Sequence, residues 1–214
     1  MKASLIYLLM CTSLVMCSSA PSNTEVIPLP EKDLSGLEKA YFASGCFWCV
    51  EAVYESVYGV EEAISGYAGG NQLNPTYEQV GGGRTDHAEA IEVYYDPEKV
   101  DFKTLVKVFY ASQDPTTVNG QHPDYGKQYR SIIFYQNDEE KQIAMEEKEL
   151  LNESGAYDKP VATEIELLTK FWKAEEYHQD FERRNPNQSY VKAVSVPRLN
   201  RFKEKMPQLL KANH

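Results

Sequence analysis

The chain has 214 residues, 42% of them hydrophobic and 25% charged, and a formal net charge of −10. This length suits one domain with extensions, and the 15 Tyr and 8 Phe residues argue against a disordered protein. The acidity argues against nucleic acid as a partner, because binding to phosphate backbones depends on clustered Lys and Arg.

Residues 1–20 have the order of a secretory signal. Lys2 precedes an apolar stretch, which ends at the small residues 18–20. Thr12 and Ser13 interrupt that stretch, whereas a membrane-spanning helix needs about 20 predominantly apolar residues. The sequence therefore predicts an exported protein.

Residues 14–17 (Leu-Val-Met-Cys) also resemble a bacterial lipoprotein signal. Cys17 would then be acylated and tether the protein to a membrane, whereas cleavage after Ala20 would release it. Both alternatives stay open, so the predicted location is the periplasm, either free or as a membrane-tethered lipoprotein. Residues 21–38 contain three prolines and predict a linker, followed by a catalytic domain over 39–190 and a C-terminal extension over 191–214.

The first predicted elements place Cys46 where a strand gives way to a helix. Residues 40–44 form a short stretch bounded by Gly45, which favours a strand. Residues 47–58 then carry apolar side chains at helical spacing.

The later predicted elements alternate between strands and helices. In chain order we expect a strand over 63–67, a helical turn over 76–80, a strand over 88–95, a helix over 102–110 capped by Asp101, a loop over 113–128, a strand over 129–135, a helix over 138–151, a strand over 163–168 and a helix over 174–184. This order predicts an α+β fold, a two-layer sandwich of the ferredoxin-like (split βαβ) type with additional loops and helices.

Two cysteines lie in the globular part of the chain, Cys46 and Cys49. A disulfide between them would close almost no loop and so would add little stability. A zinc site would need two more ligands, and the four His residues lack the spacing of such sites. Redox chemistry is therefore the favoured interpretation of the Cys-x-x-Cys pair.

The start of a helix favours a thiolate, because its first N–H groups lack intrahelical partners. We therefore expect Cys46 to be the nucleophile and Cys49, one turn later, to resolve a sulfenic acid on it as a disulfide. Phe47 and Trp48 either offer apolar ring surface to a small substrate group or are ordinary core residues.

Glu89 lies on the apolar face of its predicted strand. Loss of hydration favours the protonated form of a carboxyl group, so Glu89 is a candidate proton donor. The alternative is a carboxylate paired with Arg84 or Arg130, and the residues alone leave the two equal.

Several motifs resemble one family. They are Gly45-Cys46-Phe47-Trp48, Gly66-Tyr67-Ala68-Gly69-Gly70, Asn74-Pro75-Thr76-Tyr77, His87-Ala88-Glu89-Ala90, residues 124–131 (Asp-Tyr-Gly-Lys-Gln-Tyr-Arg-Ser) and Tyr177-His178-Gln179. Together they resemble the peptide methionine sulfoxide reductases of the A type, over residues 39–186. The resemblance implies the sandwich fold and the reduction of methionine S-sulfoxide, in proteins or as the free amino acid, to methionine.

The same resemblance implies roles for seven residues. Cys46 would attack the sulfoxide sulfur and Glu89 would protonate its oxygen. The other implied roles are hydrogen bonds to that oxygen from Tyr77 and Tyr129, binding of the methyl group by Phe47 and Trp48, and positioning of the polar end of the site by Asp124. No cofactor or metal is implied, and we expect a monomer that is recycled by a thioredoxin-like reductant.

The chain departs from the usual family pattern at Cys49, where a glycine is more common. The C-terminal cysteines that many members use to resolve the sulfenic acid are absent, which leaves Cys49 as the internal resolver. Residues 120–123 also extend a loop beside the site. Two other functions stay open on the cysteine pair, a general thiol–disulfide oxidoreductase and a lipoprotein binding module with a structural pair.

Overall fold

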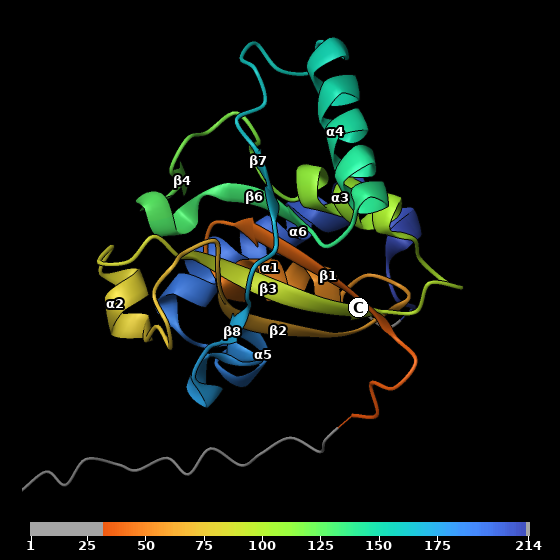
Figure 1. Ribbon diagram of the computed structural model, residues 1–214. Helices are drawn as coiled ribbons and strands as arrows, with labels where there is room; N and C mark the ends of the chain where they lie inside the picture. The colour runs from red at the N-terminus through yellow and green to blue at the C-terminus, as the bar shows by residue number, and fades with distance from the viewer. Residues whose placement is uncertain (1–31, 213–214) are drawn as a thin grey trace, which may run out of the picture.

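A computed structural model describes residues 32–212, so the predicted signal, Cys17 and most of the linker lie outside the described residues. A six-stranded sheet with the order β7-β6-β1-β3-β2-β8 forms the centre of the molecule (Figure 1). Its strands are β1 (Glu38–Ser44), β2 (Val60–Ala68), β3 (Ala88–Tyr95), β6 (Ser131–Tyr135), β7 (Glu164–Leu167) and β8 (Trp172–Lys173). All neighbouring strands are antiparallel except the parallel pair β6 and β7.

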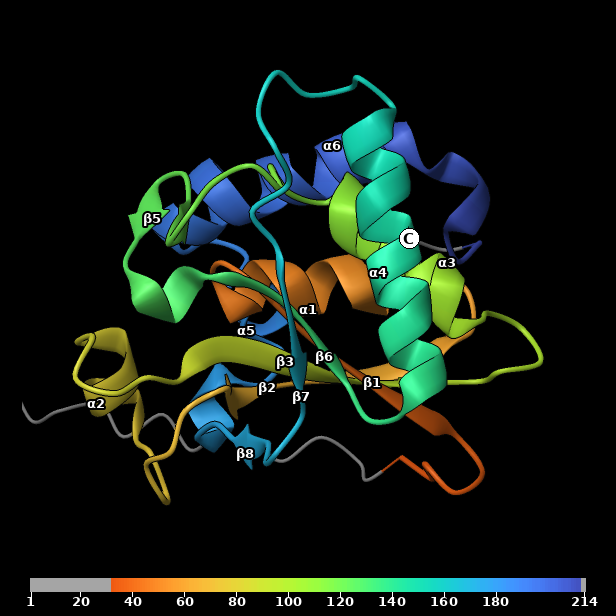
Figure 2. The same ribbon diagram turned by 45° about the horizontal axis from the view of Figure 1, so that its top comes forward.

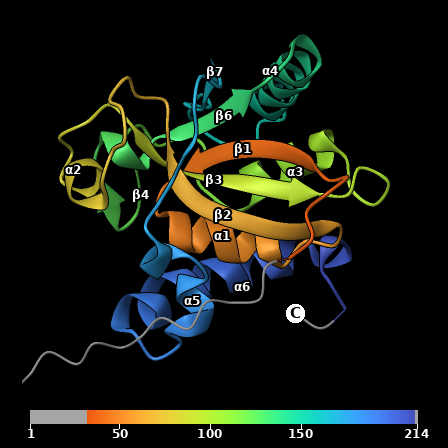
Figure 3. The same cartoon turned by 60° about the horizontal axis from the view of Figure 1, so that its bottom comes forward.

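Two crossover helices generate the order of the four central strands, β6-β1-β3-β2. Helix α1 (Phe47–Glu55) connects β1 to β2, and β3 lies between these two strands. Helix α3 (Phe102–Ala111) connects β3 to β6 in the same way around β1. Figure 3 shows α1 lying along one face of the sheet. This is the split βαβ arrangement, so the predicted α+β sandwich is confirmed.

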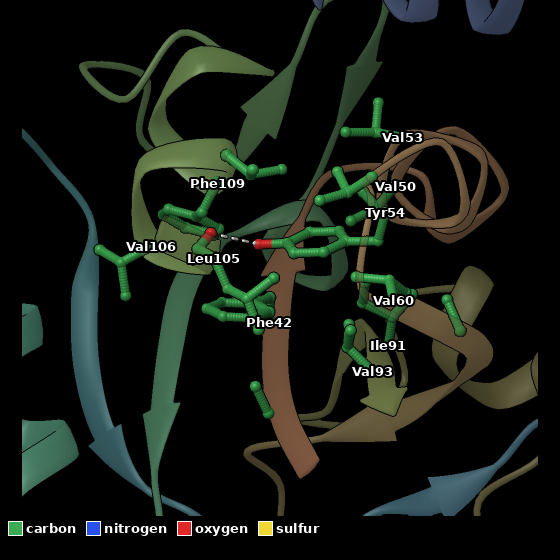
Figure 4. Packing of buried hydrophobic residues seen from close by; sticks show 14 of the residues in the cluster. Phe42, Val50, Val53, Tyr54, Val60, Ile91, Val93, Leu105, Val106 and Phe109 are labelled. Carbon is green, nitrogen blue, oxygen red and sulfur yellow. Dashed lines mark hydrogen bonds between the residues drawn. The ribbon is translucent and has the colours of Figure 1, made fainter. Parts of the chain in front are cut away.

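The main core lies between these helices and the sheet. The apolar stripe of α3 is buried, and the Asp101 carboxylate caps this helix by accepting the Thr104 N–H at 2.7 Å. Tyr54 of α1 reaches across the core and donates its hydroxyl to the Leu105 carbonyl at 3.0 Å (Figure 4). That bond satisfies the one polar atom of a fully buried side chain.

A strap between β7 and β8 crosses the opposite face of the sheet, because these strands occupy opposite edges (Figure 1). Leu168 and Phe171 of the strap pack on a small apolar cluster that includes Tyr41 and Phe134. A Cβ on Gly66 would lie 2.4 Å from the Trp172 carbonyl oxygen, so the strap requires a glycine there.

Shorter elements surround the sheet. They are α2 (Tyr77–Gly81), the hairpin β4 (Gly120–Gln121) and β5 (Asp124–Tyr125), the 3₁₀ turn η1 (Lys127–Tyr129), α4 (Asp138–Glu153), the 3₁₀ turn η2 (Glu176–His178) and α5 (Phe181–Arg184). The predicted helix over 174–184 is wrong. Asp180 has a left-handed φ of 55°, and the Gln179 side chain bonds the Ser65 backbone, so tertiary contacts break this segment into two short turns.

The segment after residue 190 packs against the domain as far as it is described. A π-helical turn, η3 (Val191–Ser195), leads into α6 (Val196–Lys205), and a 3₁₀ turn, η4 (Pro207–Leu209), follows. Val191 and Phe202 are fully buried, and α6 lies beside α1 (Figure 2). Every helix within residues 32–212 is too short or too polar to cross a membrane.

Candidate active site

Cys46 lies two residues after the end of β1 and occupies the N-cap position of α1. Gly45 makes this turn with a φ of +83°, and a Cβ at this position would lie 2.8 Å from Cβ of Gln121. A glycine is therefore required both by the backbone conformation and by the close approach of the β4 hairpin. The predicted strand-to-helix placement of Cys46 is confirmed.

A small pocket of about 180 Å³, which we call the Cys46 pocket, opens beside this residue. It is lined by Cys46, Phe47, Trp48, Tyr77, Glu89, Asp124, Tyr129 and Tyr190. Seven of the eight predicted site residues thus meet in one place, from four separate parts of the chain. The eighth, Cys49, lies one helical turn away and lines a different cavity.

Glu89 is buried at the base of the Cys46 pocket. Its side chain is on β3 and accepts the Phe47 N–H at 3.0 Å. Burial raises the pKa of Glu89 to about 8, so this carboxyl group is mostly protonated at neutral pH. Arg84 pairs with Glu78, and Arg130 pairs with Glu164. Neither of the two arginines therefore pairs with Glu89, and the arginine-pair alternative is wrong.

Two tyrosine hydroxyls from separate elements face the same space. Tyr77 begins α2 and Tyr129 ends η1. Burial raises the pKa of Tyr77 to about 12 and also raises the pKa of Tyr129. Both hydroxyls therefore keep their protons at neutral pH and can donate hydrogen bonds.

Tyr190 is a pocket residue that the sequence did not reveal. Its hydroxyl donates to the Asp124 carboxylate at 2.5 Å and lies 3.9 Å from Sγ of Cys49. It is the last residue of the predicted catalytic domain, where a single aromatic residue carries no spacing signal. Asp124, assigned only through the family resemblance, is held beside Cys46 by this contact.

The apolar wall of the pocket is fixed from behind. Trp48 stacks on Phe181 of α5 with 3.7 Å between ring centroids, and its indole N–H donates to Nδ1 of His178 at 3.1 Å. Burial lowers the pKa of His178 to about 4, so the neutral ring can accept this bond. Phe47 belongs to the main core and also lines the pocket, so its position is compatible with both interpretations of this residue.

Comparison with known proteins gives the same assignment. The sequence profile of the family described as peptide methionine sulfoxide reductase matches residues 38–210. The chain belongs to this family. It is 47% identical over 193 residues to peptide methionine sulfoxide reductase MsrA 1 of Rhodopirellula baltica, which covers 90% of this chain and 98% of that protein. It is 45% identical over 197 residues to MsrA 2 of Synechocystis sp., covering 88% of this chain and 92% of that one.

Solved structures of the family have the same fold. Methionine sulfoxide reductase A of Corynebacterium diphtheriae aligns with a TM-score of 0.65 at 32% identity, over 76% of this chain and 84% of that one. Reduced Mxr1 of Saccharomyces cerevisiae aligns with a TM-score of 0.63 at 34% identity, over 71% and 87%. The protein is therefore an oxidoreductase, a peptide methionine sulfoxide reductase of the MsrA type that uses thiol chemistry.

The two cysteine thiols are free in the structure and differ in acidity. Burial raises the pKa of Cys46 well above its ordinary value. A hydrogen bond from the Cys46 thiol and the charge of Arg198 instead lower the pKa of Cys49 to about 7. At this helix start, burial therefore opposes the thiolate that the N-terminal N–H groups favour on Cys46.

A cluster of three carboxylates lies on the other side of α1. Oxygens of Glu51, Glu55 and Asp180 lie within 4.8 Å of one another. The buried Glu51 carboxyl accepts hydrogen bonds from Ser65 and from the Asp180 N–H, and Arg183 pairs with Asp180. These bonds join α1, β2 and the turn before α5, which gives the cluster a structural role.

Proposed function

We propose that this protein reduces methionine S-sulfoxide, in proteins and as the free amino acid, with Cys46 as the nucleophile. The observation that carries the proposal is the Cys46 pocket, which joins a thiol, a carboxyl group protonated at neutral pH, two tyrosine hydroxyls and an apolar wall. A sulfoxide needs each of these groups: an attacking sulfur, a proton for its oxygen, hydrogen-bond donors and a surface for its methyl group.

The first step breaks the S–O bond. Cys49, with its lowered pKa, is placed to take the proton of Cys46 as Cys46 Sγ attacks the sulfoxide sulfur. Glu89 gives its proton to the sulfoxide oxygen while Tyr77 and Tyr129 donate hydrogen bonds to it. Methionine leaves, the oxygen stays on Cys46 as a sulfenic acid, and Glu89 is left as a carboxylate.

The second step restores the sulfur of Cys46. Cys49 attacks Sγ of the sulfenic acid, a Cys46–Cys49 disulfide forms, and the hydroxyl group leaves as water with the thiol proton. The two thiols lie close enough for each to change the pKa of the other, which supports direct attack. A thioredoxin-like dithiol then reduces the disulfide, and its own two thiols become oxidised.

The stereochemistry provides the test of function. Purified protein with dithiothreitol should convert a peptide containing the S epimer of methionine sulfoxide to methionine and leave the R epimer unchanged. Product is measured by chromatography for each epimer separately. Absence of turnover on the S epimer would refute the proposal.

A general thiol–disulfide oxidoreductase is the second candidate, because a Cys-x-x-Cys pair at a helix start suits that activity as well. Such an enzyme has no use for the protonated Glu89 or for the tyrosine hydroxyls beside Cys46. Replacement of Glu89 by Gln therefore separates the two functions: it should slow sulfoxide reduction and leave insulin disulfide reduction unaltered.

We further propose that the protein acts after export, as a monomer, and is tethered by a lipid on Cys17. The support is the order of residues 1–20 and the Cys17 context. Metabolic labelling of cells with a clickable fatty acid should mark the mature protein and fail to mark a Cys17→Ala variant.

Light scattering of the purified domain should give the mass of one chain.

A further inference from the structure

The two cysteines of the pair line two different cavities. Cys46 opens on the pocket of about 180 Å³ described above, whereas Cys49 lines a larger cavity of about 620 Å³ between α3, the β4 hairpin and α6. Asp124 and Tyr190 line both spaces, and the hydrogen bond between them forms part of the wall. We call the larger space the Cys49 cavity. A molecule can therefore approach Cys49 without passing through the Cys46 pocket.

The Cys49 cavity has a cationic side made by α6. Arg198 is buried, donates to the carbonyls of Ser44 and Ser112, and places its charge close to Cys49. Arg201 and Lys205 follow at one-turn spacings and are exposed.

Two carboxylates also line the Cys49 cavity, and both are engaged. Asp114 accepts hydrogen bonds from Thr116, and Asp124 accepts one from Tyr190. Residues 191–205 carry five Lys and Arg residues against one Glu, in a chain whose net charge is −10. A local positive surface therefore borders the cavity, although the protein as a whole is acidic. This surface attracts anionic ligands.

Gln113 provides a second, independent sign of a ligand. It lines the Cys49 cavity with 7% of its surface exposed, and neither its side-chain oxygen nor its nitrogen has a hydrogen-bond partner among the described residues. An unpaired buried amide destabilises the fold, and a ligand that pairs with it would recover that free energy. A peptide-like molecule carries the donor and the acceptor that this amide lacks.

We propose that the Cys49 cavity binds a small, anionic, peptide-like thiol, which reduces the Cys46–Cys49 disulfide at Sγ of Cys49. The inference rests on the proposed function, because it needs that disulfide as its substrate. Cavities of roughly 300–1,000 Å³ are typical of small-molecule sites, and the Cys49 cavity lies within this range. Cys49 is only 1% exposed, so a molecule that reaches it through this cavity must be slender.

The exchange balances with two molecules of thiol. The first thiolate forms a bond to Sγ of Cys49, the disulfide bond breaks, and Cys46 leaves as a thiolate that takes up a proton. The second thiolate attacks the sulfur of the bound thiol, releasing Cys49 and the oxidised dimer of the small thiol. Two electrons pass from the thiols to the protein, and Cys46 is freed facing the Cys46 pocket, ready for another sulfoxide.

The experiment compares two probes of similar size, anionic 2-mercaptoethanesulfonate and neutral 2-mercaptoethanol. The disulfide is formed with diamide on the full chain, so the result does not depend on sulfoxide turnover. The rate of reduction per thiolate is followed by acid quenching and maleimide labelling. The sulfonate should react about threefold to tenfold faster, and high salt should remove most of this preference.

Charge reversal on α6 tests the site itself. The Arg201→Glu/Lys205→Glu variant should lose or invert the preference for the sulfonate, whereas Lys141→Glu/Lys170→Glu, which makes the same charge change at exposed positions elsewhere, should retain it. Gln113→Leu should slow reduction by glutathione, used as an anionic tripeptide probe, and leave the rate with the sulfonate unchanged. Quenched mixed disulfides should map to Cys49.

The inference would be overturned by an equal preference in wild type and in the α6 variant, by an unchanged rate with glutathione in Gln113→Leu, or by a mixed disulfide on Cys46. Reduction only by a thioredoxin-like protein would also exclude the small thiol. A chain that forms no Cys46–Cys49 disulfide with diamide would refute the resolver role of Cys49 and this inference together. A disulfide reduced without any charge preference would refute the cavity site alone.

Discussion

The surroundings of Cys46 and of Cys49 differ although the two residues lie on one turn of the same helix. Cys46 faces a small pocket with a carboxyl group protonated at neutral pH and aromatic rings. Cys49 faces a larger cavity edged by Arg198 and Tyr190. Burial raises the pKa of Cys46, whereas the interaction with the Cys46 thiol and the charge of Arg198 lower the pKa of Cys49. The comparison teaches that a Cys-x-x-Cys spacing by itself does not fix which thiol is the more acidic, because the groups packed around each sulfur decide it.

Loss of the nucleophile should have the largest effect. Cys46→Ser should reduce steady-state turnover below roughly a thousandth of the wild-type rate, because a serine hydroxyl is a far weaker nucleophile for sulfur. Methionine formation is measured with dithiothreitol, and circular dichroism shows that the fold is retained. Activity near the wild-type value would move the chemistry to another residue.

Loss of the proton donor comes next. Glu89→Gln should slow the reductase step about 10²-fold, because no carboxyl group then protonates the sulfoxide oxygen. The wild-type single-turnover rate should also fall as pH rises through about 8, where Glu89 loses its proton, and the variant should lack this fall. Glu98→Gln, at an exposed position just after β3, is the matched control and should be unaltered.

The same carboxyl group should lower stability as pH rises. Its pKa is near 4.5 in the unfolded chain and about 8 in the folded protein, so the folded state binds an extra proton between these values. The contribution of Glu89 to the free energy of unfolding therefore has its full value below pH 4.5, and it decreases as the pH rises from 4.5 toward 8. Glu89→Gln should therefore raise the unfolding free energy at pH 7 by up to about 3 kcal/mol, with little gain at pH 4. Urea denaturation at both pH values measures this, and an equal change at both would contradict the burial argument.

Loss of the resolving thiol should separate the reductase step at Cys46 from the recycling step that needs Cys49. Cys49→Ser should complete one turnover and then stop, with steady-state recycling by a thioredoxin-like protein reduced at least about tenfold. Dimedone labelling should detect the trapped sulfenic acid on Cys46. Sustained thioredoxin-driven turnover in this variant would remove Cys49 from the recycling route.

Loss of the Asp124–Tyr190 hydrogen bond between the two cavities should have the smallest effect on turnover. Tyr190→Phe removes the hydrogen bond to Asp124 and should slow turnover about tenfold, equivalent to roughly 1.4 kcal/mol. Tyr125→Phe removes a hydroxyl that is exposed on the adjacent hairpin and serves as the control. Equal rates for both variants would show that the Asp124–Tyr190 contact has no part in the reaction.

The sequence predicted the sheet and crossover helices well because their signals are local. Alternating strands such as β3, the apolar stripe of α3 and its Asp101 cap are each visible within a few residues. The segment around Asp180 was predicted wrongly, since its conformation depends on bonds to Glu51 and Ser65 that are distant in sequence. The short strand β8 was missed for the same reason.

The residues of the candidate site also fall into those with a local sequence signal and those placed by contacts distant in sequence. Cys46 and Glu89 could be found from their local settings, a helix start and an apolar strand face, and the family resemblance added Tyr77, Tyr129 and Asp124. Tyr190 and Arg198 could not be found, because only the packing of η3 and α6 on α1 brings them to the cysteines. The acidity of the two thiols depends on that packing and could not be read from the motif.

One measurement tests most directly whether Cys46 is the nucleophile and Cys49 the resolving thiol. Fully reduced protein is mixed with an excess of the S-sulfoxide peptide without any reductant, and the methionine formed and the state of each cysteine are determined by mass spectrometry. We predict one methionine per chain and a Cys46–Cys49 disulfide. One methionine per chain with a sulfenic acid on Cys46 and an alkylatable Cys49 would contradict the account.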